Sequence, residues 1–482
     1  MNSLEPSTTP PRTRPRANVA LAVLVSAQLL LNIDATIVNV ALPAMRAELG
    51  LTAASLQWVV TGYLLAFGGL LLLGGRLADR LGRRRVFLVG MAVFAIGSAV
   101  AGLAQAGPAL ITGRVLQGIA SAALSPAALA LVVTLFPAGR ERDRAFGFWG
   151  AASAAGTALG LVLGGVLTQF LSWQWIFWVN LPLAAVIILV GRRVLPEHRE
   201  TITVRLDLTG AILATSGLAT ALYGVVTVAE SGWSSAPAVT ALVVGAALLA
   251  GFAHSQWTRP EPLVPARLLR QRAFLGANLV GATVCVAINA AYFFVTLFLS
   301  EVLRYGPLAI GLAFLPLALA VAVSSHFTAR WIGRTGARTL LLASTVLIAA
   351  GMGLLTQIDP DQGYAVVVLP ALLVLGLGLG IALVALTASA VGGAPAEDSG
   401  VAAAVFSTSL QVGGAVGLAL LTAVSTAVSG PEAAVGGAAA LQAQTGGWTT
   451  GFAIAAATMI LGLVITLLTI PRKPLMQVTT CA

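Results

Sequence analysis

The chain has 482 residues, of which 58% are hydrophobic and only 9% are charged. Soluble domains carry about 25% charged residues, so this composition excludes an ordinary soluble protein. The net charge of +10 would suggest a nucleic-acid partner on a soluble surface, but its placement along this chain excludes that partner. Two cysteines, Cys285 and Cys481, do not form a disulfide framework, and three isolated histidines give no metal-ligand spacing.

Fourteen apolar stretches are long enough to cross about 30 Å of hydrocarbon. We expect the chain to be an all-α polytopic membrane protein. With the N-terminus in the cytoplasm, all but three of the 27 Lys and Arg residues fall in cytoplasmic segments; the exceptions are Arg46, Arg114 and Arg304. This asymmetry predicts that both termini are cytoplasmic. The expected spans are 17–43, 55–75, 86–106, 109–136, 145–169, 174–191, 207–229, 236–256, 273–300, 308–329, 339–357, 364–390, 400–428 and 448–470.

The first stretch contains a single acid, Asp34, near its middle. An ionised carboxylate in the hydrocarbon region is costly, so such a residue indicates function by default. Asn32, Thr36 and Asn39 add polar groups at helical spacing, so this helix cannot turn every face to lipid. We expect Asp34 to carry protons and to face a hollow that solvent reaches. The alternative is a neutral, hydrogen-bonded acid that serves only packing.

An arginine-rich loop, GRLADRLGRRR, follows the second stretch and begins at Gly75. Simple positive-inside charge would not need its acid or its glycine spacing, so we interpret it as a gating motif. Asp79 can pair with its arginines or interact with a helix N-terminus. The residues assigned to this motif are Gly75, Asp79, Arg80, Gly82, Arg83 and Arg84.

A related segment, ARWIGRTGAR at 329–338, matches this loop at a constant offset of 254 residues. Such internal repeats are typical of transporters built from two related bundles. We therefore expect a tail (1–16), a six-helix bundle (17–195), an inserted two-helix hairpin (207–256), a second six-helix bundle (273–470) and a second tail (471–482).

The fourth stretch carries Arg114, Gln117 and Ser121 on one small and polar face. An arginine within a span needs a partner or a water-filled cavity, and Asp34 is the acid available in the same half. We expect the two to interact, directly or through water. Alternatively, Arg114 lies shallow enough for its head to reach the membrane surface.

Small residues recur every four positions in the fifth stretch, at Gly156, Gly160 and Gly164. This spacing favours close helix packing in lipid. Other polar and aromatic residues indicate a broad, mainly apolar substrate cavity, although interhelical hydrogen bonds would explain them equally well. The cavity residues are Asn32, Thr36, Asn39, Gln57, Trp58, Tyr63, Gln117, Ser121, Asn289, Tyr292 and Gln411.

The segments IDATIVNVALP (33–43), the loop from Gly75, and GRVLQGIASAALSP (113–126) together resemble the major facilitator superfamily, specifically its fourteen-span drug/proton antiporter branch. Segments from Leu206 and Pro262 are similar to those flanking that branch's inserted hairpin. Two features depart from the family pattern. Leu161 replaces a proline of the fifth-helix motif, and Gln174 replaces the arginine of the Trp-Arg-Trp that usually follows it. Some relatives also carry an acid in the tenth stretch, where this chain has none between Leu308 and Ala329.

The resemblance implies a major-facilitator fold and proton-coupled multidrug efflux by alternating access. It implies a monomer in the plasma membrane that uses the proton-motive force and no cofactor. Its partners would be protons, lipid and lipophilic or cationic molecules, with dications poorer substrates than monocations. The alternatives are an exporter of one self-made metabolite or antibiotic, and an uptake symporter. A membrane enzyme would need clustered acids or basic residues in a large outer loop, and segment 429–447 has only one acid, Glu432. A sensor would need a soluble domain.

Overall fold

The computed structural model describes residues 14–136, 139–196, 207–232, 234–259, 266–391, 399–430 and 437–472. Within these ranges the chain is helical and contains no strand, and fourteen helical segments are long and apolar enough to cross a membrane. The predicted number of spans is therefore confirmed. Most of the two predicted tails, 1–13 and 473–482, lies outside the described residues.

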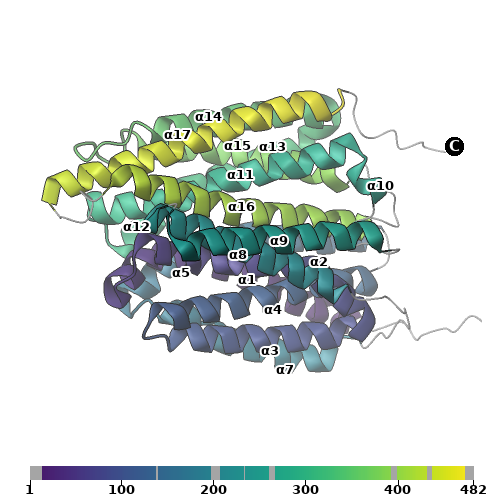
Figure 1. Ribbon diagram of the computed structural model, residues 1–482. Coiled ribbons are helices and arrows are strands. Elements are labelled where there is room, and N and C mark those ends of the chain that lie inside the picture. The colour runs from purple at the N-terminus through teal and green to yellow at the C-terminus, as the bar shows by residue number, and fades with distance from the viewer. Residues whose placement is uncertain are drawn as a thin grey trace, which may run out of the picture.

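The helices follow one another in the order shown in Figure 1. Their bounds are α1 (Arg14–Leu49), α2 (Ala53–Leu81), α3 (Arg83–Gly102), α4 (Gly107–Leu135), α5 (Arg140–Phe170), α6 (Trp175–Trp178), α7 (Asn180–Val194), α8 (Leu208–Ser231), α9 (Ala236–Thr258), α10 (Ala266–Leu269), α11 (Arg272–Leu297), η1 (Phe298–Val302), α12 (Pro307–Ala313), α13 (Leu315–Thr335), α14 (Ala337–Leu355), α15 (Val368–Val391), α16 (Ser399–Ser429) and α17 (Gly437–Thr469). The element η1 is one turn of π-helix that continues α11.

Three boundaries differ from the sequence-based expectations. Helix α1 continues through Pro43 to Leu49, and α17 begins at Gly437 instead of near residue 448. Much of the expected loop 429–447 is therefore helical, because its run of small residues does not interrupt the helix. The tenth span is divided at Phe314 into α12 and α13. Pro316 follows that break, where its missing N–H is tolerated within a first helical turn.

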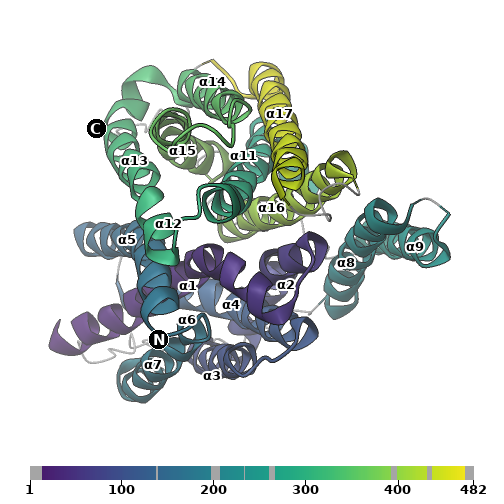
Figure 2. The same cartoon turned by 90° about the vertical axis from the view of Figure 1, so that its left-hand side faces the viewer.

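The helices form two groups with a hairpin beside them. Figure 2 shows α1–α7 below, α11–α17 above, and α8 and α9 at one side next to α2 and α16. Leu65 of α2, Leu222 of α8 and Ala415 of α16 share one apolar cluster, so α8 covers the line where α2 meets α16. The Asp207 carboxylate accepts a hydrogen bond from the Gly210 amide and also from Gln256 at the end of α9. This buried acid joins the two ends of the hairpin.

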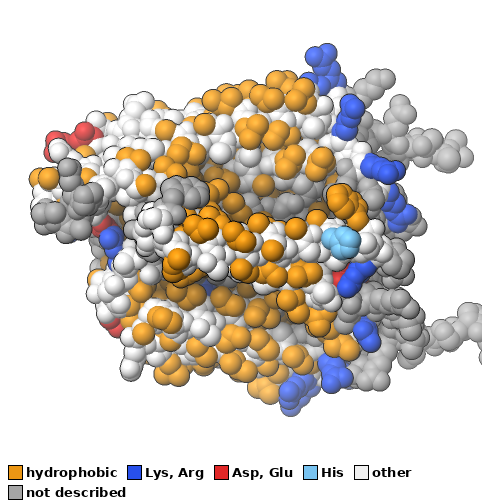
Figure 3. All heavy atoms as spheres, viewed as in Figure 1, with side chains coloured by type: hydrophobic (Ala, Val, Ile, Leu, Met, Phe, Trp, Pro, Cys, Tyr) orange, Lys and Arg blue, Asp and Glu red, His pale blue; other side chains and the backbone are white. Residues whose placement is uncertain are grey.

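Charge separates the two ends of the bundle. Figure 3 shows an apolar band across this face of the molecule, with most of the visible Lys and Arg side chains at one end. We call this the basic end; α2, α7 and α13 end there, and α3, α5, α11 and α14 begin there. The opposite, or far, end contains the loops between α1 and α2 and between η1 and α12. An apolar band of this kind between two polar ends is the surface that a bilayer requires.

Candidate functional site

A buried ion pair joins α1 to α4 in the middle of the first helical group. Arg114 Nη1 lies 2.7 Å from Asp34 Oδ2, and the side chains are 1% and 0% exposed. The other carboxylate oxygen, Oδ1, accepts hydrogen bonds from Gln117 at 2.7 Å and from Asn180 at 2.8 Å. Both oxygens of Asp34 are thus bonded, as a charge removed from water requires.

The Arg114 guanidinium has further partners that fix its position. Its Nε donates to the backbone oxygen of Val59 at 3.0 Å, and Nη1 also donates to Gln117 Oε1 at 2.7 Å. The guanidinium carbon lies 4.4 Å from the centre of the Tyr63 ring, a cation–π contact. The expected interaction between Arg114 and Asp34 is therefore direct, and Arg114 does not reach the membrane surface.

Two members of this buried cluster were not identified from the sequence. Ser98 of α3 accepts hydrogen bonds from Gln117 at 2.8 Å and from Asn180 at 3.2 Å, and both Ser98 and Asn180 are fully buried. Asn180 is the first residue of α7 and lies two positions after the aromatic helix α6. An amide within an apolar run was the available signal. Ser98 gave none, because single serines are common in spans.

The enclosure of Asp34 corrects one expectation. Its carboxylate does not face a hollow, because side chains from α3, α4 and α7 converge on it. Tyr63, Gln117 and Ser121 were expected to line the substrate cavity, yet they are at most 2% exposed and belong to the Asp34 cluster. The Tyr63 hydroxyl lies 3.2 Å from Ser121 Oγ. Their polar atoms bond to one another instead of facing a ligand.

The remaining predicted cavity residues divide into two sets. Thr36, Asn39 and Gln57 are buried, with exposures of 8%, 7% and 1%. Thr36 and Asn39 donate to backbone oxygens of their own helix. Thr36 also donates to the Thr157 oxygen of α5 at 3.3 Å, an interhelical bond of the kind that the alternative interpretation expects. The partly exposed set comes from both helical groups and comprises Asn32, Trp58, Asn289, Tyr292 and Gln411.

Three hollows on the described part of the chain are lined neither by Asp34 nor by a predicted cavity residue. One, of about 730 Å³, lies between α1 and α5 at the basic end. A second, about 450 Å³, lies between α3 and α7, and a third, about 380 Å³, lies among α2, α3 and α4.

The arginine-rich motif lies at the basic end, between α2 and α3. Arg83 donates from Nε and Nη2 to Asp79 Oδ1, both at 3.3 Å, and from Nη1 to Thr134 of α4 at 2.7 Å. Arg84 donates to the backbone oxygen of Arg192 at the end of α7. Gly82 joins the two helices with φ of +96°, a conformation that favours glycine. These bonds tie the motif to its own helical group.

Two other motif residues, Arg80 and Gly75, have smaller roles. Arg80 is exposed to solvent. A Cβ on Gly75 would lie 3.7 Å from Pro126, which is ordinary contact, whereas one on Gly74 would lie 2.0 Å from the Ala122 oxygen. The close approach between α2 and α4 is thus made by Gly74, the residue immediately before the motif.

The three spaced glycines of α5 lie against α1. A Cβ on Gly156 would be 2.8 Å from the Cβ of Asn32, and one on Gly160 would be 2.1 Å from Thr36 Oγ1. One on Gly164 would be 2.7 Å from the Ile37 oxygen. Helix α5 therefore packs directly on the polar side of α1. Leu161, at the position of the family's proline, presents its backbone oxygen to Gly311 of α12.

At the far end the two helical groups are joined. Arg46 at the end of α1 forms an ion pair with Glu301 of η1. The Leu308 amide of α12 donates to Gln169 Oε1 of α5 at 3.0 Å, and a Cβ on Gly165 would lie 2.8 Å from the Leu308 Cα. These contacts connect α1 and α5 to η1 and α12. The structure is therefore closed at the far end.

A tyrosine stabilises the same end within the second group. The hydroxyl of Tyr364, in the loop before α15, donates to the Ala313 oxygen of α12 at 2.7 Å. Burial, and to a smaller extent the neighbouring Tyr305, raises the pKa of Tyr364 to about 12. The phenol stays protonated, and remains a donor, at any physiological pH.

Fourteen membrane-length helices, a closed far end and a buried acid–arginine pair define a polytopic membrane transporter. The chain belongs to the Major Facilitator Superfamily, whose family profile matches residues 24–418. The family and its similar proteins place it among transporters and not among enzymes. They also agree with the fourteen-span drug antiporter branch.

Three similar proteins are named for drug resistance or antibiotic export. The chain is 45% identical to the puromycin resistance protein Pur8 of Streptomyces alboniger, over 76% of this chain and 73% of that protein. It is 39% identical to the cephamycin export protein CmcT of Amycolatopsis lactamdurans, over 76% of both chains. It is 34% identical to the multidrug resistance protein Stp of Mycobacterium tuberculosis, over 76% of this chain and 68% of that protein.

Solved structures share the fold. A bacterial homologue of the human lysosomal transporter Spinster, in an inward-facing conformation, aligns with a TM-score of 0.66 at 16% identity, covering 95% of this chain and 97% of the other. The POT family transporter PepTSo aligns with a TM-score of 0.67 at 16% identity, covering 95% of this chain and 99% of the other. These likenesses support the architecture alone.

Proposed function

We propose that the protein is a proton-coupled antiporter that exports lipophilic or cationic small molecules across the plasma membrane. The observation that carries this proposal is the ion pair between Asp34 and Arg114, a carboxylate at the centre of a span with both oxygens bonded. The names of Pur8, CmcT and Stp, which concern drug resistance or antibiotic export, support the substrate class.

The pair gives a physical route from proton binding to conformational change. Protonation of Asp34 removes the charge that balances Arg114, and an unpaired guanidinium in the hydrocarbon region is costly. The guanidinium must then find other partners or water, which requires α1, α4 and α7 to shift. Since Asp34 is enclosed in this structure, proton exchange with solvent takes place in another conformation of the cycle.

The closed far end indicates which state this is. With the basic end in the cytoplasm, closure through Arg46, Glu301 and Gln169 corresponds to an inward-facing state. In the outward-facing state these contacts separate, and the motif around Asp79 closes the cytoplasmic side. Asn32 and Trp58 of the first group and Tyr292 of the second line the substrate route.

The driving force is the proton-motive force, without a cofactor, and the transporting unit is the monomer. Each pH unit of gradient contributes about 1.4 kcal/mol per proton. A membrane potential adds about 2.3 kcal/mol per 100 mV for each net charge moved. Exchange of one proton for a neutral molecule uses both contributions, whereas exchange for a monocation uses the pH gradient alone.

Inverted membrane vesicles test the proposal. A pH gradient, acid inside, is followed with a pH-sensitive dye while puromycin or ethidium is added. We expect either compound to dissipate the gradient with the wild-type protein and not with Asp34→Asn. Asp361→Asn, the same change on an exposed loop, should behave as wild type.

Continued accumulation of substrate against its gradient by Asp34→Asn would refute the role of this carboxylate. Acidification of the vesicle interior on substrate addition would indicate a symporter instead. A protonophore control separates both outcomes from passive leakage of the compound.

One alternative has support of its own. CmcT is named as an exporter of a single antibiotic class, and a tetracenomycin C resistance and export protein of Streptomyces glaucescens is 33% identical over 78% of this chain. A dedicated exporter would move one compound of an efflux panel, whereas a multidrug exporter would move several unrelated ones.

A further inference from the structure

The hollow between α1 and α5 lies apart from the Asp34 cluster. It is a wedge of about 730 Å³ between the basic ends of α1 and α5, which diverge below their glycine contacts. Its volume is within the usual range for small-molecule sites. We call it the α1–α5 pocket, and its lining residues are Ala17, Asn18, Leu21, Ala22, Val25, Ser26, Phe136, Glu141, Arg144, Ala145 and Phe148.

The pocket opens away from the second helical group. Leu161 and Gly165 mark the side of α5 that contacts α12. At 100° per residue, Arg144 lies roughly 100° around the helix from Leu161 and 60° from Gly165, and Phe148 lies roughly 140° and 100° from them. The pocket therefore faces the membrane side of the first group, at the depth where the spans begin. A molecule in it would come from the lipid leaflet at the basic end.

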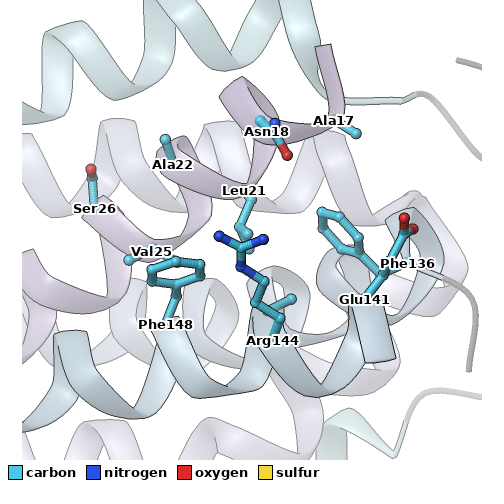
Figure 4. A pocket seen from close by; sticks show the side chains of 11 residues that line it. Ala17, Asn18, Leu21, Ala22, Val25, Ser26, Phe136, Glu141, Arg144 and Phe148 are labelled. Atoms are coloured by element: carbon cyan, nitrogen blue, oxygen red, sulfur yellow. The ribbon is translucent and has the colours of Figure 1, made fainter. Parts of the chain in front are cut away.

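Two opposite charges in the pocket have no ion-pair partner in the described chain. Figure 4 shows the Arg144 guanidinium between the rings of Phe148 and Phe136, with the Glu141 carboxylate beyond Phe136. Arg144 lies 5.7 Å from the centre of the Phe148 ring, and no salt bridge joins it to Glu141 among the described residues. The site offers one cation and one anion to a ligand, above an apolar wall of Leu21 and Val25.

We propose that the α1–α5 pocket binds an aminophospholipid, with Arg144 holding the phosphate and Glu141 holding the primary ammonium. Arg144 lies three residues deeper in the span than Glu141, about 4.5 Å along the helix axis. An ethanolamine link spans such a distance, and the phosphate is the deeper group in a bilayer. Basic pockets between helices at this depth are recognised lipid-headgroup sites. The glutamate adds selectivity for a headgroup that can donate hydrogen bonds.

Binding to lipids that differ only in the headgroup tests the proposal. Native mass spectrometry of the purified full-length protein would compare phosphatidylethanolamine with phosphatidylcholine of the same acyl chains. We expect wild type to bind the ethanolamine lipid about tenfold more tightly, because only that headgroup can donate charge-assisted hydrogen bonds to Glu141.

Removal of each charge should have a different effect on lipid binding. Arg144→Gln should lower the affinity for both lipids about tenfold, because the phosphate contact is common to them. Glu141→Gln should reduce the affinity for the ethanolamine lipid alone, to the level measured for the choline lipid. Arg140→Gln is the matched control, since Arg140 begins the same helix but does not line the pocket.

Four results would overturn the proposal. They are equal binding of the two lipids by wild type, unchanged binding by Arg144→Gln, and tighter binding of phosphatidylglycerol, which has no amine. The fourth is displacement of the lipid by puromycin or ethidium, which would make the pocket a substrate site. None of these readouts depends on transport.

Discussion

Asp34 of α1 and Arg114 of α4 are 80 positions apart in sequence, yet their side chains meet at 2.7 Å, and neither is more than 1% exposed. The pair is neutral as a unit, so its burial costs far less than the burial of either charge alone. Gln117 and Asn180 complete the bonding of the carboxylate. Loss of one partner and loss of both should therefore have different consequences.

A double-mutant cycle on this pair should separate stability from transport. Arg114→Gln leaves a buried carboxylate without its cation, and this is expected to cost about 3–5 kcal/mol. The double variant Asp34→Asn/Arg114→Gln removes both charges and should regain most of that loss. Thermal unfolding of the purified variants in detergent measures both effects.

Efflux assays on the same variants distinguish a proton carrier from a packing acid. The double variant should remain inactive in proton-coupled efflux despite its recovered stability. If activity returned together with stability, Asp34 would be a packing residue and the alternative interpretation would hold. Asp361→Asn/Arg140→Gln, with both changes at exposed positions, controls for double substitution.

Much of the fold could be predicted because lipid imposes simple rules on sequence. Fourteen apolar runs gave fourteen spans, and the interaction of Asp34 with Arg114 followed from the cost of two charges in the membrane. Asn180 and Ser98 could not be found in this way. A polar residue's partner depends on which helices pack together, and helical periodicity within one span does not encode that.

The same limit explains the errors among the predicted cavity residues. Gln117, Ser121 and Tyr63 are polar and on the expected faces, but those faces meet other helices and not a hollow. The packing glycines were easier to predict. A run of small residues every fourth position has one common physical use, whereas an isolated polar residue in a span has several.

Charge selectivity of substrates should follow from the small number of acids in the spans. The tenth span, Pro307–Thr335, contains no acid, and Asp34 is already neutralised by Arg114. A second positive charge on a substrate would meet no carboxylate, so dications should be transported more slowly than monocations. Rates for a mono- and a bis-quaternary dye of similar size test this, and equal rates would contradict it.

The contact of α5 with α1 should be intolerant of even one methyl group. In Gly160→Ala the new Cβ would lie 2.1 Å from Thr36 Oγ1 and 2.8 Å from the Ile33 oxygen. Overpacking of this kind typically costs about 1–3 kcal/mol. Gly150→Ala is the matched control on the same helix, because nothing lies within 4 Å of its Cβ.

The two alanine variants are compared by thermal unfolding. Gly150→Ala should be neutral or should stabilise by up to about 1 kcal/mol, since alanine restricts the unfolded chain. Gly160→Ala should unfold at a lower temperature. Equal melting temperatures for the two variants would show that α1 and α5 separate easily.

Gln57 of α2 should lower the stability of the folded protein, and a contact with substrate would explain why it is present. It is 1% exposed, and neither its amide nitrogen nor its oxygen has a partner in the described chain. Such a group costs about 1–3 kcal/mol, so Gln57→Leu should raise the melting temperature. If Gln57 contacts substrate in another state, efflux should fall in the same variant. A variant that is more stable and fully active would exclude that contact.

The ion pair between Arg46 and Glu301 should hold the far end closed. The two side chains are 30% and 21% exposed, so the pair is expected to contribute at most about 1 kcal/mol. That amount still changes the ratio of closed to open states severalfold.

Glu301→Arg places two like charges together and should favour opening, whereas the exchanged pair Arg46→Glu/Glu301→Arg should restore closure. Labelling of Asn289→Cys from the far side, in a background without Cys285 and Cys481, measures this opening. Identical labelling of the single and exchanged variants would show that Gln169 and the α5–α12 contact keep the far end closed without the ion pair.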